Sequence, residues 1–172
     1  TDPGLLAVNG TFELTVNNTN DTPLPADDSY STDEDLPLSV SALQGVLDND
    51  ADPDGDVLEV VGIVGPPAHG SASLAADGSL VYTPDGDFNG VDSFTYSVTD
   101  PTGAVATASV SITVNPVNDA PVALDDAYTV NEDTLLNVPI GTGSLLDGDT
   151  DVEGDTLETV AIVTSPLSGA LS

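Results

Sequence analysis

Carboxylate side chains recur at every second position in two stretches of this chain. The stretches are Asp48, Asp50, Asp52, Asp54, Asp56 and Asp147, Asp149, Asp151, Glu153, Asp155. Alternate side chains of an extended strand share a face about 7 Å apart, and two carboxylates at about 4 Å repel by on the order of 4 kcal/mol at an effective dielectric of 20. The chain has no Lys or Arg, so relief must come from protonation, solvent or a bound cation. Oxygen ligands without His or Cys favour calcium over zinc or copper.

The spacing does not fit an EF-hand loop. With Asp50 as the first ligand, Gly55 falls at the turn position, but Val61 stands where a bidentate Glu is needed. With Asp48 as the first ligand, Pro53 replaces the turn glycine. The alternative explanation for the alternation is a solvated acidic strand edge that keeps the protein soluble. The same spacing in both stretches favours calcium.

The composition excludes several classes of partner. The chain has 30 Asp and Glu, no Lys or Arg and one His, which gives a net charge of −30. Nucleic acid and anionic membrane surfaces would repel such a chain, so we do not expect nucleic-acid binding. The sequence has no apolar run of 18 residues, so we do not expect membrane insertion either. Apolar residues make up 39% of the sequence, which favours folded domains over disorder. Cysteine is absent, so neither disulfides nor thiolate metal sites are available.

The sequence repeats itself with a long period. Asn20-Asp21-Thr22-Pro23 returns 98 residues later as Asn118-Asp119-Ala120-Pro121, and beyond the following apolar segment the offset becomes 99. A fixed long period indicates an array of copies of one domain. We therefore expect residues 1–21 to be the end of one module, 22–119 a complete module, and 120–172 the front part of a third. The third piece should lack the strands that close its core.

The elements that must position the carboxylates are predicted to be short strands. Apolar and polar residues alternate with a period of two, and Gly, Pro and Asp separate the segments. The expected strands are 11–16, 29–32, 36–40, 57–64, 70–74, 79–83, 93–98 and 107–114, with a possible single helical turn at 41–47. About seven short strands per module predict an all-β fold of tandem Greek-key sandwiches of the immunoglobulin-like or cadherin-like kind.

Aromatic residues are expected in the core of that sandwich. Tyr82 and Tyr96 can each bury a ring while the hydroxyl stays at an edge. Phe88 and Phe94 should pack beneath the turn at Asn89-Gly90. No exposed aromatic cluster that could hold a sugar is predicted.

Several motifs together resemble a known family. They are Val117-Asn118-Asp119-Ala120-Pro121, Asp126-Ala127-Tyr128, Asn131-Glu132-Asp133, Tyr82-Thr83-Pro84, Phe88-Asn89-Gly90 and Val98-Thr99-Asp100. The chain is similar in these motifs, over essentially its whole length, to the bacterial cadherin-like tandem repeats of large surface adhesins. The resemblance implies modules joined by linkers that bind calcium between them.

The resemblance also implies a ligand set. Asn118-Asp119 is similar to the cadherin linker, Glu34 to the glutamate of the upstream module, and Asp149 and Asp151 to the paired aspartates downstream. Asp100 is similar to the aspartate that closes the penultimate strand, and we expect it at the same junction. By the same logic Asn20-Asp21 would join Asp50 and Asp52, and the alternation adds Asp56 and Asp155 as candidate metal ligands.

The predicted function is structural. His69 is the one candidate for a neutral base, and its counterpart in the third piece is Ser168, so catalysis is not expected. We expect a calcium-binding extender in an extracellular bacterial adhesin at the cell surface. Its partners would be neighbouring modules of the same chain, and other domains would meet a cell-surface protein or glycan. The alternatives are a linker or accessory carbohydrate-binding module of a large secreted hydrolase, and direct homophilic adhesion, for which no Trp anchor is present.

Overall fold

The computed structural model of the chain describes residues 11, 13–138 and 144–159. Within them the regular structure lies between Asp28 and Asn115. The elements are β1 (Asp28–Asp33), β2 (Leu38–Val40), η1 (Ala42–Gln44), β3 (Glu59–Gly65), β4 (Gly70–Leu74), β5 (Leu80–Pro84), β6 (Gly90–Thr99) and β7 (Val105–Asn115). The predicted all-β fold is confirmed.

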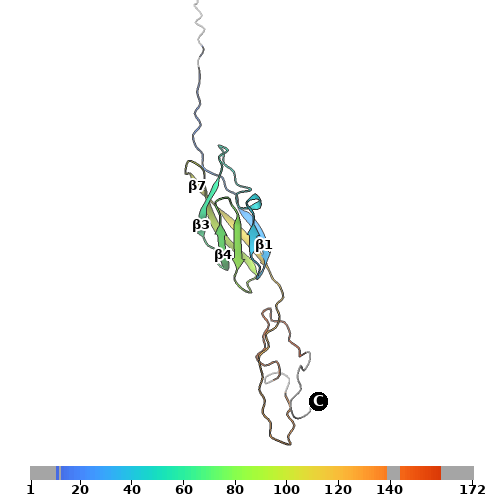
Figure 1. Cartoon of the computed structure of the whole chain (residues 1–172). Helices are drawn as coiled ribbons and strands as arrows, with labels where there is room; N and C mark the ends of the chain where they lie inside the picture. The colour runs from blue at the N-terminus through green and yellow to red at the C-terminus, as the bar shows by residue number, and fades with distance from the viewer. Residues whose placement is uncertain (1–10, 12, 139–143, 160–172) are drawn as a thin grey trace, which may run out of the picture.

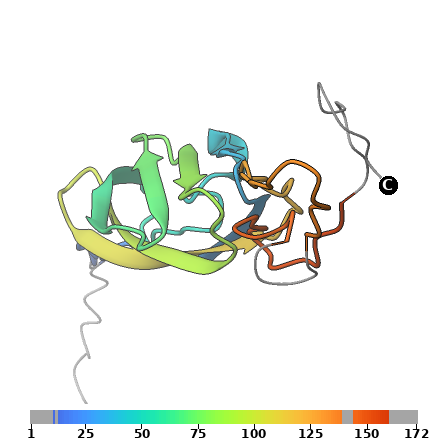
Figure 2. The ribbon, with the colours of Figure 1, turned by 90° about the horizontal axis from the view of Figure 1, so that it is seen from below.

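The strands form two sheets that face each other (Figures 1 and 2). One sheet has four strands in the order β1-β7-β6-β3, and the other has three in the order β2-β5-β4. All neighbours are antiparallel except β1 and β7, which run parallel. The chain changes sheet at each step from β1 to β4 and again between β5 and β6, whereas β4–β5 and β6–β7 are hairpins within one sheet. Such crossings between layers are typical of a cadherin-like or immunoglobulin-like sandwich.

The alternation of residue types explains which face each strand buries. Along β7 the apolar residues from Ala108 to Val114 point inward, and the Ser and Thr residues between them are exposed. Leu80 and Tyr82 face inward from the opposite sheet in the same way. The buried core is Val46, Val60, Leu80, Tyr82, Phe94, Tyr96, Val98, Ala108, Val110, Ile112 and Val114.

The aromatic residues take the places that the sequence predicts. Tyr82 and Tyr96 are both 0% exposed, and their hydroxyls donate to the Asp92 carboxylate and the Val46 carbonyl, each at 2.9 Å. Phe94 is buried. Phe88 packs against the core and stacks on His69 with ring centroids 4.2 Å apart. Each buried hydroxyl therefore has a partner.

Except for β4, the strands differ from the expected boundaries by one to three residues. The second strand starts at Leu38 rather than Leu36, because Asp35 adopts a left-handed φ of 62° and the Leu36 N–H donates to the Asp33 carbonyl in a turn. The helical turn predicted at 41–47 is the 3-10 helix η1. Among the described residues, no helix has the length and apolar character needed to cross a bilayer.

The strand expected at 11–16 is not formed at residues 11 and 13–16, so that prediction is wrong for them. A strand needs a hydrogen-bonding neighbour, and none lies beside this segment in the described structure. Leu14 and Val16 are accordingly 72% and 81% exposed.

Residues 120–138 and 144–159 contain an isolated bridge between Val122 and Thr150 but no strand. Figure 1 shows them at the end of the sandwich opposite to the entry of the N-terminal segment. By the sequence repeat, candidate strands of the third piece should carry Val130, Leu136, Val138, Leu157 and Ile162. The first four lie here without strand pairing, and Ile162 lies outside the described residues.

Candidate metal centre

Two linkers meet the sandwich at opposite ends (Figure 1). Asn20-Asp21 leads into it near the turn after β6, and Asn118-Asp119 follows the end of β7. Because no Lys or Arg is present, each linker enters a region of uncompensated negative charge. The second junction brings more carboxylates together.

At the second junction, Asp35, Asp87 and Asp119 form a cluster in which one carboxylate oxygen of each lies within 4.8 Å of the others. Asp35 follows β1, Asp87 lies between β5 and β6, and Asp119 belongs to the linker. Asp119 Oδ2 is buried and has no hydrogen-bond partner. Burial, together with the charges of Asp35 and Asp87, raises the pKa of Asp119. An all-oxygen cluster with an unpartnered buried oxygen fits a hard cation such as calcium.

The backbone at this cluster is strained. Asp35 and Asp87 have φ angles of 62° and 58°, in the left-handed region that residues with a Cβ rarely adopt. Such conformations are found at functional sites, where the surrounding structure enforces them. Asp133, which corresponds to Asp35 in the next copy, has a φ of 60°. The same turn is therefore built twice in this chain.

Glu34, expected as a ligand, lies next to the cluster but is engaged by the chain itself. Its Oε1 accepts a hydrogen bond from the Val117 N–H at 2.5 Å, and its Oε2 accepts one from Asn89 Nδ2 at 3.2 Å. The side chain is 2% exposed. Asn118, the linker asparagine, donates its amide to the Asp119 carbonyl at 2.7 Å.

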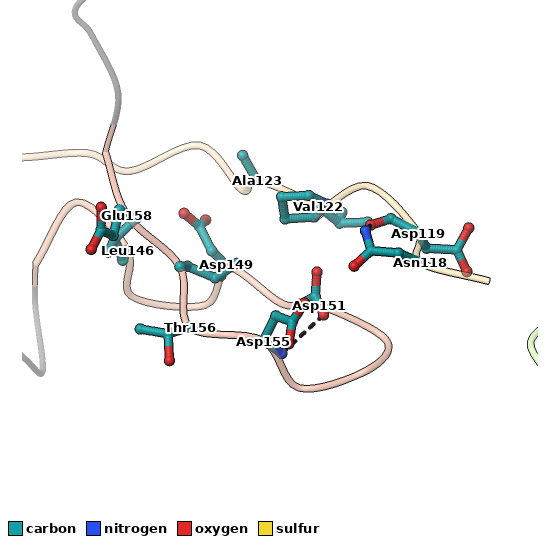
Figure 3. A pocket seen from close by; sticks show the side chains of 12 residues that line it. Asn118, Asp119, Val122, Ala123, Leu146, Asp149, Asp151, Asp155, Thr156 and Glu158 are labelled. Carbon is teal, nitrogen blue, oxygen red and sulfur yellow. Dashed lines mark hydrogen bonds between the residues drawn. The ribbon is translucent and has the colours of Figure 1, made fainter. Parts of the chain in front are cut away.

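The downstream aspartates line a polar cavity of about 320 Å³ beside the linker. Figure 3 shows the Asp119 carboxylate directed away from this loop, whereas we expected it to share an ion with Asp149 and Asp151. Asp149 Oδ1 instead accepts the Leu124 N–H at 2.8 Å, and Asp151 Oδ1 accepts the Asp155 N–H at 3.0 Å. Among the downstream residues Asp149, Asp151 and Asp155, only the charge of Asp151 is among those that raise the pKa of Asp119.

The first junction gathers a second acidic group around its linker. Asn20 Nδ2 donates to Asp100 Oδ2 at 2.8 Å, and this bond, with others from the following turn, lowers the pKa of Asp100 to about 2. Asp52 Oδ2 is buried and has no hydrogen-bond partner. Burial and the charges of Asp52, Asp100 and Asp54 raise the pKa of Asp56.

The expected position of Asp100 was therefore wrong. It lies with Asn20 at the first junction, not with Asp119 at the second. The ten residues of β6 separate it from the loop that holds Asp87, and a strand of that length spans about 30 Å.

Asp50 was expected beside Asp21, but its carboxylate contacts Ala26 and Tyr96 instead. Its Oδ1 accepts the Ala26 N–H at 2.8 Å, and its Oδ2 lies 3.2 Å from the Tyr96 hydroxyl. Asp21 donates its backbone N–H to Asp54 Oδ2 at 2.6 Å. The alternation therefore separates its members: Asp50 faces the core tyrosine and Asp54 faces the linker.

Comparison with known proteins agrees with this architecture. The family model of the bacterial cadherin-like domain matches residues 20–116, more than half of the 172-residue chain. The chain belongs to this family. The bacterial Ig domain model matches residues 118–172.

Individual relatives of this cadherin-like chain are distant. It is 32% identical over 161 residues to the protein GAMETE EXPRESSED 2 of Arabidopsis thaliana, covering 93% of this chain and 16% of that protein. A nucleoside hydrolase-related hypothetical protein from Saccharophagus degradans, associated with carbohydrate metabolism, is similar over 56% of this chain and 26% of its own, with 19% identity and a TM-score of 0.39. An endo-fucoidan hydrolase of glycoside hydrolase family 107 is similar over 59% of this chain and 15% of its own, with 21% identity and a TM-score of 0.38.

The contacts around the cadherin-like linkers recur in the second copy. The bridge between Leu24 and Ala51 corresponds to that between Val122 and Thr150. The hydrogen bonds from Ala26 to Asp50 and from Leu124 to Asp149 correspond in the same way. So do those from the Asp21 N–H to Asp54 and from the Asp119 N–H to Glu153.

Four acidic residues at the junctions were missing from the expected ligand set. They are Asp35, Asp54, Asp87 and Glu153. Asp54 and Glu153 belong to the alternating stretches, and Asp35 recurs as Asp133 beside the repeated glutamate. That recurrence was a usable signal for Asp35. Asp87 has no described counterpart, and the fold alone brings it to the linker.

Proposed function

We propose that this chain is a calcium-binding structural repeat of an extracellular bacterial adhesin, in which bound calcium stiffens the junctions between sandwich modules. The observation that carries the proposal is the cluster of Asp35, Asp87 and Asp119, which joins a sandwich to its linker. The role is that of a spacer and requires no catalysis. Membership of the bacterial cadherin-like family supports it.

The ligand chemistry supports calcium at this junction. Asp35, Asp87 and Asp119 would hold the ion, and Asp151 lies close enough for its charge to act on Asp119. Calcium accepts six to eight oxygen ligands in flexible arrangements, so water and backbone carbonyls would complete the shell. The bound ion would supply the positive charge that the chain lacks.

The proposed module boundaries follow the linkers. Residues 22–119 would form one complete module, with the end of a preceding module at 1–21 and the front of a following one at 120–172. The partners of each module would be its neighbours in the chain. Other domains of the adhesin would then bind the cell-surface protein or glycan.

Small-angle X-ray scattering of the chain tests the extender role. We expect calcium to increase the maximum dimension relative to chelator, because the ion fixes the angle between the linker and the sandwich. Asp119→Ala should remove this response, whereas Asp125→Ala, at an exposed position outside the cluster, should keep it. Identical profiles in calcium and in chelator would contradict the proposal.

A further inference from the structure

Glu34 is the least exposed carboxylate among the described residues, at 2%. Burying a carboxylate is costly unless hydrogen bonds or an opposite charge compensate it. The chain offers no Lys or Arg for that purpose. The groups that do contact Glu34 therefore indicate its role.

Those groups come from two segments, the end of β7 with the linker that follows it and the turn before β6. The Val117 N–H in the linker donates to Oε1 at 2.5 Å, and Asn89 Nδ2, just before β6, donates to Oε2 at 3.2 Å. The backbone N–H of Glu34 donates to the Asn115 carbonyl at 2.9 Å and continues the pairing of β1 with β7. Hydrogen bonds to an ionised acceptor are stronger than neutral ones, so Glu34 holds the linker against the sandwich.

Asp35, the next residue, faces a different group. Its left-handed φ of 62° follows the end of β1, and its carboxylate lies in the cluster with Asp87 and Asp119. Glu34 is not a member of that cluster, although it lies close enough for its charge to contribute to raising the pKa of Asp119. Asp35 Oδ1 also accepts the Asp87 N–H, at 3.3 Å. The two adjacent carboxylates nevertheless differ: each oxygen of Glu34 has its own donor, in the linker or just before β6, whereas Asp35 belongs to the candidate cation site.

The downstream side of each linker is held by the same kind of contact. Asp54 accepts the Asp21 N–H at 2.6 Å and also contacts Asn18 Nδ2. Glu153 accepts the Asp119 N–H at 3.4 Å. In both junctions a carboxylate therefore binds the linker backbone and leaves the side chain of the linker aspartate to other partners.

We propose that Glu34 is a positioning residue, which places Asp119 beside Asp35 and Asp87 by holding the Val117 N–H and Asn89, and does not itself bind the cation. The proposal rests on the proposed calcium site. It gives the glutamate a different role from the ligand role that the family resemblance implies.

The test compares Glu34→Gln and Asp35→Asn in the full chain. Hydrogen exchange of the Val117 amide is measured in chelator, and calcium binding by calorimetric titration. Glu132→Gln is the matched control, because Glu132 occupies the equivalent place in the next copy but is exposed. Asn89→Ala is a second variant: it removes one donor to Glu34 at an exposed position and leaves every carboxylate in place.

Glu34→Gln should speed Val117 exchange about fivefold in chelator, because a neutral acceptor replaces a charged one. It should keep the number of bound calcium ions, with affinity lowered less than tenfold. Asp35→Asn should leave Val117 exchange unchanged in chelator and lower calcium affinity more than tenfold. Asn89→Ala should raise Val117 exchange by a smaller factor.

Unchanged Val117 exchange in both Glu34→Gln and Asn89→Ala would overturn the proposal. A calcium affinity that falls as far in Glu34→Gln as in Asp35→Asn would also overturn it. If Glu34→Gln does not fold, the hydrogen-exchange rate of the Val117 amide in Asn89→Ala decides the question: an unchanged rate overturns the proposal. If the unmodified chain binds no calcium, the calcium function fails, and exchange measured in chelator still shows whether Glu34 holds the linker.

Discussion

At the scale of single residues, the junction depends on side-chain directions that strained backbone produces. Asp35 and Asp87 carry left-handed φ angles and meet Asp119, although long stretches of sequence separate all three. The repeated motif singled out Asp119, which lies in this cluster. Nothing in the sequence shows that Glu34 turns toward Val117 while Asp35 turns toward the cluster. The left-handed backbone conformation of Asp35 and Asp87 is visible only in the structure.

A second group of carboxylates surrounds the Tyr96 hydroxyl, which lies 3.1 Å from Asp28 Oδ2 and 3.2 Å from Asp50 Oδ2. Burial raises the pKa of Asp28 to about 6, although the Tyr96 hydroxyl lowers it in part, and the charge of Asp50 adds to the rise. Because the folded pKa exceeds that of the unfolded chain, ionisation of Asp28 destabilises the fold. The contribution of protonated Asp28 to stability is fully present below about pH 4 and is lost as the pH rises through about 6.

Asp28→Asn should therefore stabilise the protein at pH 8 by on the order of 1 kcal/mol, after allowance for solvent screening of a partly exposed group. The gain should disappear as the pH falls toward 4. Urea unfolding of the core at both pH values measures the difference. Asp126→Asn, the equivalent change in the next copy, should have no such effect on the core. A gain of the same size at both pH values would contradict the assignment.

At the scale of elements, alternating residues predicted all seven strands between Asp28 and Asn115. Their ends were harder to predict. β6 begins at Gly90 and β7 at Val105, both earlier than the clear alternation, because cross-strand pairing extends them beyond it. The expected strand at 11–16 failed for the opposite reason: its residues alternate, but no described neighbour pairs with them.

Asp92 on β6 anchors the connection between β3 and β4. Its two carboxylate oxygens accept hydrogen bonds from the N–H groups of Ala68, His69 and Ser93 and from the Tyr82 hydroxyl. Burial acts to raise its pKa, but these donors outweigh burial and lower it. Its contribution to stability is thus present above the unfolded pKa and is lost as the pH falls through the lowered folded value.

Asp92→Ala should destabilise the module by about 2–4 kcal/mol at neutral pH, because it removes the acceptor of the buried Tyr82 hydroxyl and of three part-buried N–H groups. Chemical denaturation followed by tyrosine fluorescence measures the loss. Asp85→Ala, an exposed change in the turn before β6, is the control and should cost less than about 0.5 kcal/mol. A loss for Asp92→Ala no larger than for the control would show that the anchor is not needed.

At the scale of the whole molecule, the chain combines one closed sandwich with a following segment that has no strand in its described part. The repeat in the sequence is matched by a second set of linker contacts in the structure, including the bridge between Val122 and Thr150. It also predicted a piece whose core is not covered. A segment whose described residues have one isolated bridge and no strand has few protected amides.

Amides at 130–138 and 144–159 should therefore exchange much faster than those of β6 and β7. Hydrogen exchange detected by mass spectrometry measures this, with cleavage at acidic or aromatic residues because the chain contains no Lys or Arg. Sedimentation in the same buffer establishes that the sample is monomeric. Equal protection in a monomer would mean that residues 120–172 fold without further strands.

The central claim is that calcium at Asp35, Asp87 and Asp119 stabilises this junction. Thermal unfolding of the full chain tests it most directly, in millimolar calcium and in chelator at matched ionic strength, with Asp87→Asn beside the unmodified chain. Calcium at a hundred times its dissociation constant should add about 2.7 kcal/mol of stability. The melting temperature of the unmodified chain should rise accordingly, and that of Asp87→Asn should rise far less. Superimposable melting curves of the unmodified chain in calcium and chelator would contradict the account.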